Sequence, residues 1–193
     1  MTITYRVGSG LYINMTNRCT NDCVFCIRRY CDSVGTADSL WLDTEPSREE
    51  VLEDILKLDL TEYEEIVFCG YGEPTVRLDD LIWICAQLKK VCSLPIRVNT
   101  NGHASLIAGY DTTPLFKNLV DRVSISLNAP DEDEYNRICK PVFEKYAYQS
   151  VLSFAESVKS YVPEVVLSVM GGTTDIERCR LIAEEMGLRL RVR

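Results

Sequence analysis

Residues 10–26 read GLYINMTNRCTNDCVFC, a short apolar run that passes directly into a loop holding Cys19, Cys23 and Cys26. The apolar run predicts a β-strand over residues 10–15, because short segments of this kind bounded by turn-forming residues are typical of strands. Cysteine spacings of four and three residues let three thiolates converge on one cluster from a single turn. The stretch therefore predicts a strand that carries a cluster-binding loop at its carboxyl end.

The rest of the chain repeats this strand pattern, with helical segments between the strands. Helical spacing of apolar residues is clearest over 47–60, 78–91 and 174–186. Ser47 followed by Glu50 predicts a capping box, and Gly187 predicts a left-handed helix end. The five further strands are expected at 65–69, 96–100, 122–127, 165–170 and 188–192, and a run at 3–7 is expected to pair with the first strand.

Strands that alternate with helices indicate parallel strands joined by crossover helices. We therefore expect an α/β fold, an incomplete (βα)6 barrel of parallel strands formed by one domain over residues 1–193. An open doubly wound sheet is the alternative. In either architecture, active-site residues lie at the carboxyl ends of the strands.

Composition narrows the class of protein. The 193 residues are 46% hydrophobic, and 29 acidic against 21 basic side chains give a formal charge of -8, which disfavours extended nucleic-acid binding. No signal-peptide pattern or apolar run of about 20 residues is found, so we expect a soluble cytoplasmic protein. Nine cysteines, three of them within eight positions, fit metal or cluster ligation in a reducing compartment better than disulfides.

The segment from Cys19 to Cys26, with Phe25 before the third cysteine, resembles the CxxxCxxC signature of the radical S-adenosylmethionine (SAM) superfamily. The resemblance implies a 4Fe–4S cluster on Cys19, Cys23 and Cys26, with SAM bound at the open iron and cleaved reductively to a 5'-deoxyadenosyl radical. A zinc site or an electron-transfer cluster with Cys31 as fourth ligand is the alternative, although no second CxxC unit is present. Cys31 is expected to be a bystander. Cys139 is expected to pack, with a redox-active thiol near substrate as the other interpretation.

A second motif, CGYGEPT, follows the second predicted strand of the barrel and resembles the GGEP segment that binds the SAM amino group in this superfamily. The resemblance assigns SAM contacts to Gly70, Gly72, Glu73 and Pro74. Glycines let backbone approach a ligand, and a carboxylate accepts from an ammonium group. Tyr71 replaces the usual first glycine of that motif.

Two further strand ends carry polar residues. VNTNG places Asn99 and Asn101 at the third strand, where similar TNG segments line the SAM site. In VSISLNAP, alternation places Ser126 and Asn128 on one polar face, with Ser126 as the candidate for the SAM carboxylate. His103, the single histidine, is expected to be a solvated loop residue rather than a general base.

Over almost its full length the sequence resembles the small TatD-associated radical SAM proteins, a label that implies association with a TatD-family hydrolase and specifies no substrate. The small size is also similar to glycyl-radical activases and to the deazaguanine synthase. A small-molecule or protein-borne substrate is expected. The non-catalytic alternative is a SAM-binding or redox-sensing iron–sulfur module without turnover.

Arginines form two candidate binding sites. Arg189, Arg191 and Arg193 alternate with apolar residues in the last predicted strand. They either protect an exposed sheet edge or face a barrel interior, where Arg191 and its neighbours would bind an anionic substrate. Arg28 and Arg29, just beyond the cysteine loop, are expected to face a flavodoxin or ferredoxin electron donor.

Overall fold

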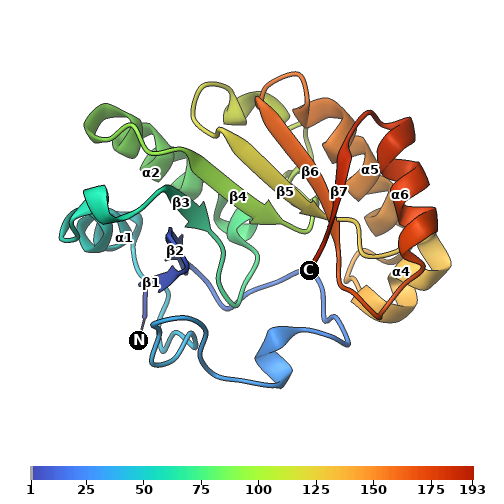
Figure 1. Cartoon of the computed structure of the whole chain (residues 1–193), viewed down its shortest axis with the longest axis horizontal. Helices are drawn as coiled ribbons and strands as arrows, with labels where there is room; N and C mark the ends of the chain where they lie inside the picture. Colours follow the sequence, from blue (N-terminus) through green and yellow to red (C-terminus); the bar gives the residue numbers. More distant parts are fainter. Residues whose placement is uncertain (1) are drawn as a thin grey trace.

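The computed structural model describes residues 2–193 and contains one seven-stranded sheet with the strands in chain order (Figure 1). β1 (Thr4–Val7) is antiparallel to β2 (Gly10–Ile13), and every later neighbour pair is parallel. All six strands predicted for the barrel, and the pairing of residues 3–7, are confirmed. The remaining strands are β3 (Glu65–Phe68), β4 (Ile96–Thr100), β5 (Arg122–Ser126), β6 (Glu164–Val169) and β7 (Arg189–Val192).

The consecutive strand order distinguishes the two predicted architectures. A doubly wound sheet reverses its order at a switch point, whereas here each crossover adds the next strand on the same side. The α/β fold with six parallel strands is therefore the incomplete barrel, and the doubly wound alternative is wrong. In Figure 1 the arrowheads of β3 to β6 point toward the blue loop that follows β2, which brings the cysteines to the carboxyl ends of the strands.

The helices form where local sequence signals favour them. Ser47 and Glu50 make the predicted reciprocal capping box, and Gly187 has a φ of 65°. The first helix ends earlier than predicted, because Asp59 accepts from the backbone of Thr61 and starts a 3₁₀ turn there. The helices are α1 (Arg48–Leu56), α2 (Leu78–Val91), α3 (Ala104–Ala108), α4 (Glu132–Cys139), α5 (Ala147–Val158) and α6 (Ile176–Glu185).

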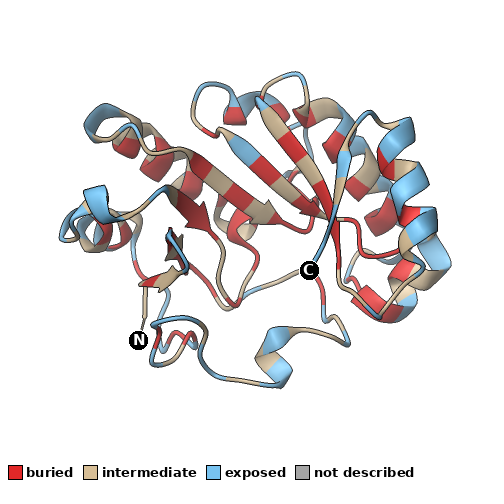
Figure 2. Cartoon of the chain, viewed as in Figure 1, coloured by how far each residue is buried: buried red, intermediate tan, exposed pale blue. Residues whose placement is uncertain are grey.

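The two faces of the sheet differ in polarity. On β5, Val123 and Ile125 are buried in the core, while Ser124 and Ser126 lie on the opposite face at intermediate exposure. The same alternation is visible as red bands along the central strands in Figure 2, whereas β7 is mostly pale blue. One face therefore packs on the helices and the other presents polar side chains. No helix within residues 2–193 is long and apolar enough to cross a membrane.

Candidate active site

The cysteine loop is anchored between β2 and α4. The backbone N–H of Asp22 donates to Cys139 O at 3.0 Å, and that of Val24 donates to Ile138 O at 2.8 Å. Asn21 forms an isolated bridge with Pro141. These bonds satisfy backbone groups of an irregular segment. The end of α4 thereby holds the three cysteines beside the carboxyl ends of the strands.

The three thiols have surroundings that suit a cluster. Cys19 Sγ accepts from Asn21 N at 3.4 Å, and Cys26 Sγ accepts from Arg28 Nε at 3.3 Å. N–H donors of this kind stabilise thiolate sulfur in iron–sulfur sites. Burial raises the pKa of Cys19 to about 12, so its thiolate needs the positive charge of bound iron.

Within residues 2–193 no three His, Cys, Asp or Glu side chains converge on one ion-sized point. A cubane cluster binds each thiolate to a different iron, so separated sulfurs are compatible with it. The donor set of Cys19, Cys23 and Cys26 thus fits a 4Fe–4S cluster.

A buried polar network connects this loop to the end of β4. Asn101 Nδ2 donates to Thr20 Oγ1 at 2.8 Å, and Thr20 Oγ1 also lies 3.0 Å from His103 Nδ1. Tyr135 OH lies 3.2 Å from His103 Nε2 and accepts from Asn21 Nδ2 at 3.0 Å. The two residues between Cys19 and Asp22 are therefore fixed by β4 and α4 together.

The expectation that His103 is a solvated loop residue is wrong. His103 is fully buried, and its ring packs edge-on against Tyr135 and Phe143. Burial lowers its pKa to about 4, so the ring is neutral at pH 7. The Asn-Gly turn before it suggested exposure. Its partners Thr20 and Tyr135 lie 83 and 32 residues away, and nothing local in the sequence indicates them.

Glu73 has four hydrogen-bond donors from the protein itself. Its carboxylate accepts from the Thr75 backbone and hydroxyl, from Thr100 Oγ1 at 2.7 Å and from Asn101 N at 2.7 Å. The side chain is 4% exposed, and burial raises its pKa. Glu73 therefore positions the end of β4, a role that the motif alone does not reveal. Its contact with SAM stays a prediction.

Gly70 and Gly72 permit close contact between two loops. A Cβ on Gly70 would lie 2.1 Å from Asn14 Oδ1, and one on Gly72 would lie 2.3 Å from Thr16 O. Glu73 N also donates to Arg18 O at 2.8 Å. These glycines thus let the segment after β3 support the cysteine loop, and their predicted ligand contacts remain untested.

The departure from the family motif at Tyr71 has a structural explanation. Tyr71 is buried, donates to Cys31 O and meets Trp41 edge-on at 5.1 Å. It belongs to a small second core that includes Tyr5 and Leu40. Pro74, also buried, begins the 3₁₀ turn that leads into α2. Tyr71 thereby anchors the chain beyond the cysteines.

The remaining predicted SAM residues lie on the polar face of the sheet. Asn99 Oδ1 is buried with no partner among residues 2–193, so it is available to accept from a ligand. Ser126 Oγ and Asn128 Oδ1 each accept from Arg193 at 3.3 Å. Asn128 also donates to Cys139 Sγ at 3.5 Å. These polar groups all adjoin the strand ends, while their binding of SAM stays a prediction.

The cysteines outside the signature have different surroundings. Cys31 points back to Ile27 O, at 3.9 Å. Cys139 is fully buried at the end of α4 beside Cys23, and the interaction of the two thiols lowers the pKa of Cys23 and raises that of Cys139. Cys139 thus packs, as expected, but directly against a predicted cluster ligand.

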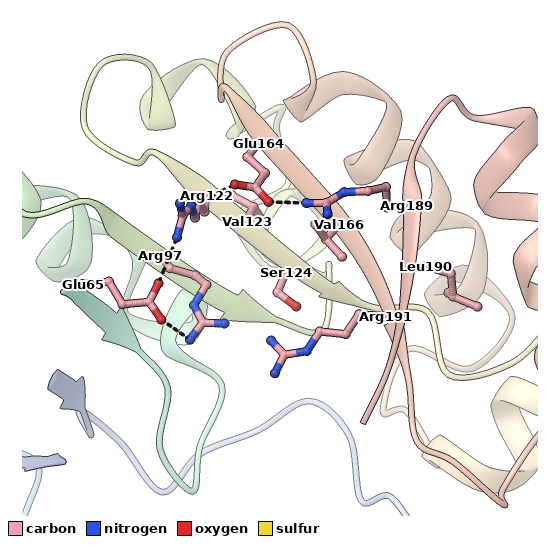
Figure 3. A pocket seen from close by; sticks show the side chains of 10 residues that line it. All are labelled: Glu65, Arg97, Arg122, Val123, Ser124, Glu164, Val166, Arg189, Leu190 and Arg191. Atoms are coloured by element: carbon pink, nitrogen blue, oxygen red, sulfur yellow. Dashed lines mark hydrogen bonds and ion pairs between the residues drawn. The ribbon is translucent and has the colours of Figure 1, made fainter. Parts of the chain in front are cut away.

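The arginines of the two candidate sites are arranged differently. Arg28 folds back on the cysteine loop, donating to Cys26 Sγ and to Asn17 O, whereas Arg29 is exposed and paired with Asp22. Arg191 lines a cavity on the polar face of the sheet, together with Arg97 and side chains from β3 to β7 (Figure 3). Binding of donor or substrate by these arginines stays a prediction.

Comparison with known proteins agrees with this arrangement. The family model described as "Radical SAM superfamily" matches residues 13–184. The chain belongs to the radical SAM superfamily. Members of this superfamily bind a 4Fe–4S cluster and SAM.

Two curated relatives share substantial identity, and both are named "Probable GTP 3',8-cyclase". The protein from Methanocella arvoryzae is 32% identical over 141 residues, covering 71% of this chain and 40% of the relative. The protein from Thermoplasma volcanium is 30% identical, covering 67% of this chain and 36% of the relative. The chain thus spans about two fifths of the length of these relatives.

Solved radical SAM structures share the fold at low identity. Streptococcus suis SuiB, bound to its precursor peptide SuiA, superposes with a TM-score of 0.65 at 14% identity, over 95% of this chain and 38% of that one. The structure titled "Native anSMEcpe with bound AdoMet" gives 0.64 at 19% identity, over 94% and 50% of the two chains. These likenesses confirm the partial barrel.

Alanine at Cys19, Cys23 or Cys26 is expected to remove the cluster and SAM cleavage together, since each loses one of three ligands. Cys31→Ala, a matched control on the same loop, should keep both. Iron and sulfide content with visible absorption measures the outcome. Cluster loss in Cys31→Ala combined with retention in Cys26→Ala would show that the ligand assignment is wrong.

Glu73→Ala is expected to lower the free energy of unfolding by about 1–3 kcal/mol, because it leaves the Asn101 N–H and buried hydroxyls without an acceptor. Urea unfolding followed by circular dichroism measures this. Glu185→Ala, on the exposed side of α6, is the control. An equal effect in the two variants would contradict the positioning role.

The lowered pKa of His103 predicts that the free energy of unfolding depends on pH between about 6.5, the pKa of the unfolded chain, and about 4, the pKa of the folded protein. The unfolded chain binds a proton in this window and the folded one does not, so stability falls as pH falls. Between pH 7 and pH 5 this group should lower the free energy of unfolding by about 2 kcal/mol. His103→Gln should lack that part of the decrease, measured by urea unfolding at both pH values. An unchanged pH dependence in the variant would overturn the assignment.

Proposed function

We propose that the chain abstracts a hydrogen atom from a small anionic substrate bound on the polar face of the half-barrel. When bound, the cluster supplies the electron that cleaves SAM to methionine and a 5'-deoxyadenosyl radical. Cys19, Cys23 and Cys26 would hold this cluster. The observation that carries the proposal is the partly buried network from Thr20 to Asn101 and His103, which holds the cysteine loop beside the strand ends.

The chain's own residues would bind, orient and shield. Asn99 Oδ1, buried without a partner, would accept from the nucleoside of SAM, and Ser126 would bind its carboxylate. Arg28 would stabilise the cluster through its hydrogen bond to Cys26 Sγ. Neutral His103 would hold Thr20 in place instead of transferring protons, because its pKa of about 4 leaves it a poor base at pH 7.

Two observations guide the choice of substrates and partners to test. The curated relatives carry the name "Probable GTP 3',8-cyclase", so GTP belongs in any substrate panel. The resemblance to TatD-associated proteins supports a search for a TatD-family hydrolase as partner, in the cytoplasm. A flavodoxin or ferredoxin would supply the electron.

The second candidate function is a SAM-binding or redox-sensing module without turnover, and one assay distinguishes the two. Anaerobically reconstituted protein with dithionite and SAM is expected to yield 5'-deoxyadenosine and methionine, quantified by liquid chromatography. Cys26→Ala is the negative control. Cluster and SAM binding without any 5'-deoxyadenosine above this control would favour the sensing module.

A further inference from the structure

One end of the cavity in Figure 3, near the amino ends of the strands, is lined by a row of alternating acidic and basic side chains. Arg97 pairs with Glu65 at 2.8 Å, and Arg122 pairs with Glu65 at 3.5 Å and with Glu164 at 2.9 Å. Arg189 pairs with the other oxygen of Glu164. Two carboxylates thus share three guanidinium groups, so the row keeps a net positive charge and has no free carboxylate to accept a further cation.

Arg191 lies one inward-facing position farther along β7, beyond this row. It pairs in register with Ser168, which pairs with Ser126 at the end of β5. No carboxylate among residues 2–193 pairs with it, and in Figure 3 its guanidinium points into the cavity without a dashed line. Arg191 is therefore an unneutralised charge between the paired row and the cysteine end of the barrel.

Two other donors face the same space. Arg97 lines the cavity, and its Nη2 atom binds Glu65 and Tyr12. Its Nη1 atom has no hydrogen-bond partner among the described residues and is not buried, so it can donate to a ligand in the cavity. Ser124 projects into the cavity between Arg97 and Arg191, as Figure 3 shows.

The donor geometry favours phosphate over carboxylate. A single guanidinium satisfies a planar carboxylate through two parallel bonds, whereas phosphate oxygens point in several directions. Here donors come from three different strands, β4, β5 and β7. The cavity of about 390 Å³ is large enough for the phosphate of a small metabolite.

We propose that Arg97, Ser124 and Arg191 form a phosphate-binding subsite, and that the substrate is a phosphorylated small molecule whose other end extends toward the cluster. The substrate role rests on the proposed function, while binding of phosphate does not. Arg189 is not part of the subsite, because it pairs with Glu164 and its side chain is mostly exposed to solvent, whereas the side chain of Arg97 is largely buried.

Isothermal titration calorimetry of the anaerobically reconstituted protein with inorganic pyrophosphate, at fixed ionic strength, tests the subsite. Arg191→Gln should weaken binding about tenfold or more, the effect of losing a charged hydrogen-bond partner. Arg189→Gln, which removes the same charge from the same face, should change it less than about threefold. Malonate, a dicarboxylate, should bind more weakly than pyrophosphate.

Absence of saturable binding, or equal losses in the two arginine variants, would overturn the subsite, and stronger binding of malonate would overturn its phosphate preference. Ser124→Ala, which alters no charge, should also weaken binding. Arg189→Gln, which lies outside the subsite, should still release 5'-deoxyadenosine with dithionite. Failure of that cleavage in the wild type, with Arg191-dependent pyrophosphate binding retained, would refute the proposed function and leave the subsite standing.

Discussion

The structure of the site depends on Asn101, whose backbone and side chain connect three segments. Its N–H donates to Glu73 after β3, its Nδ2 donates to Thr20 in the cysteine loop, and its Oδ1 accepts from His103 N. All of these groups except Thr20 are buried, so each hydrogen bond replaces one that water would otherwise make. The ends of β3 and β4, together with α4, therefore hold the cysteine loop in place.

Local pattern was sufficient to predict the strands and their order of appearance, because alternation on β5 and the apolar runs reflect burial on one face. It was also sufficient to indicate the radical SAM superfamily, because the CxxxCxxC spacing lies along one loop, while ligation of a cluster by Cys19, Cys23 and Cys26 stays a prediction. It failed for His103, because burial of a single polar residue depends on partners from distant segments, Thr20 and Tyr135. Gly70 and Gly72 were recognised as positions of close approach, but the approaching atoms belong to residues 14–18 of the chain itself. The glycines in the sequence indicated that other atoms lie close to the backbone at these positions, but not which atoms these are.

The arginines of β7 show that a sequence pattern can place side chains on one side of a strand without revealing their function. The sequence placed Arg189, Arg191 and Arg193 on one side of a strand, and the structure puts that side toward the cavity. β7 is an edge strand in the described sheet, and Arg189 pairs with Glu164, whereas Arg191 pairs with no carboxylate among residues 2–193; substrate binding by Arg191 stays a prediction. Which of the two arginines has a carboxylate opposite depends on Glu164, contributed by the neighbouring strand.

The contacts of Arg28 differ from those expected of a residue that faces an electron donor. A guanidinium that donates to Cys26 Sγ acts on the sulfur and thereby on the reduction potential of a bound cluster, since hydrogen bonds to ligand sulfur tune that potential. It is also half-buried and lies 6.0 Å from the ring of Trp41, so little of its charge is presented to a partner protein. Arg29 remains on the outer surface, but its ion pair with Asp22 leaves that spot close to neutral. Arg28 and Arg29 alone therefore offer little net positive charge to an acidic electron donor, and their contact with one stays a prediction; Lys140 and Lys145 are further exposed basic residues that follow α4.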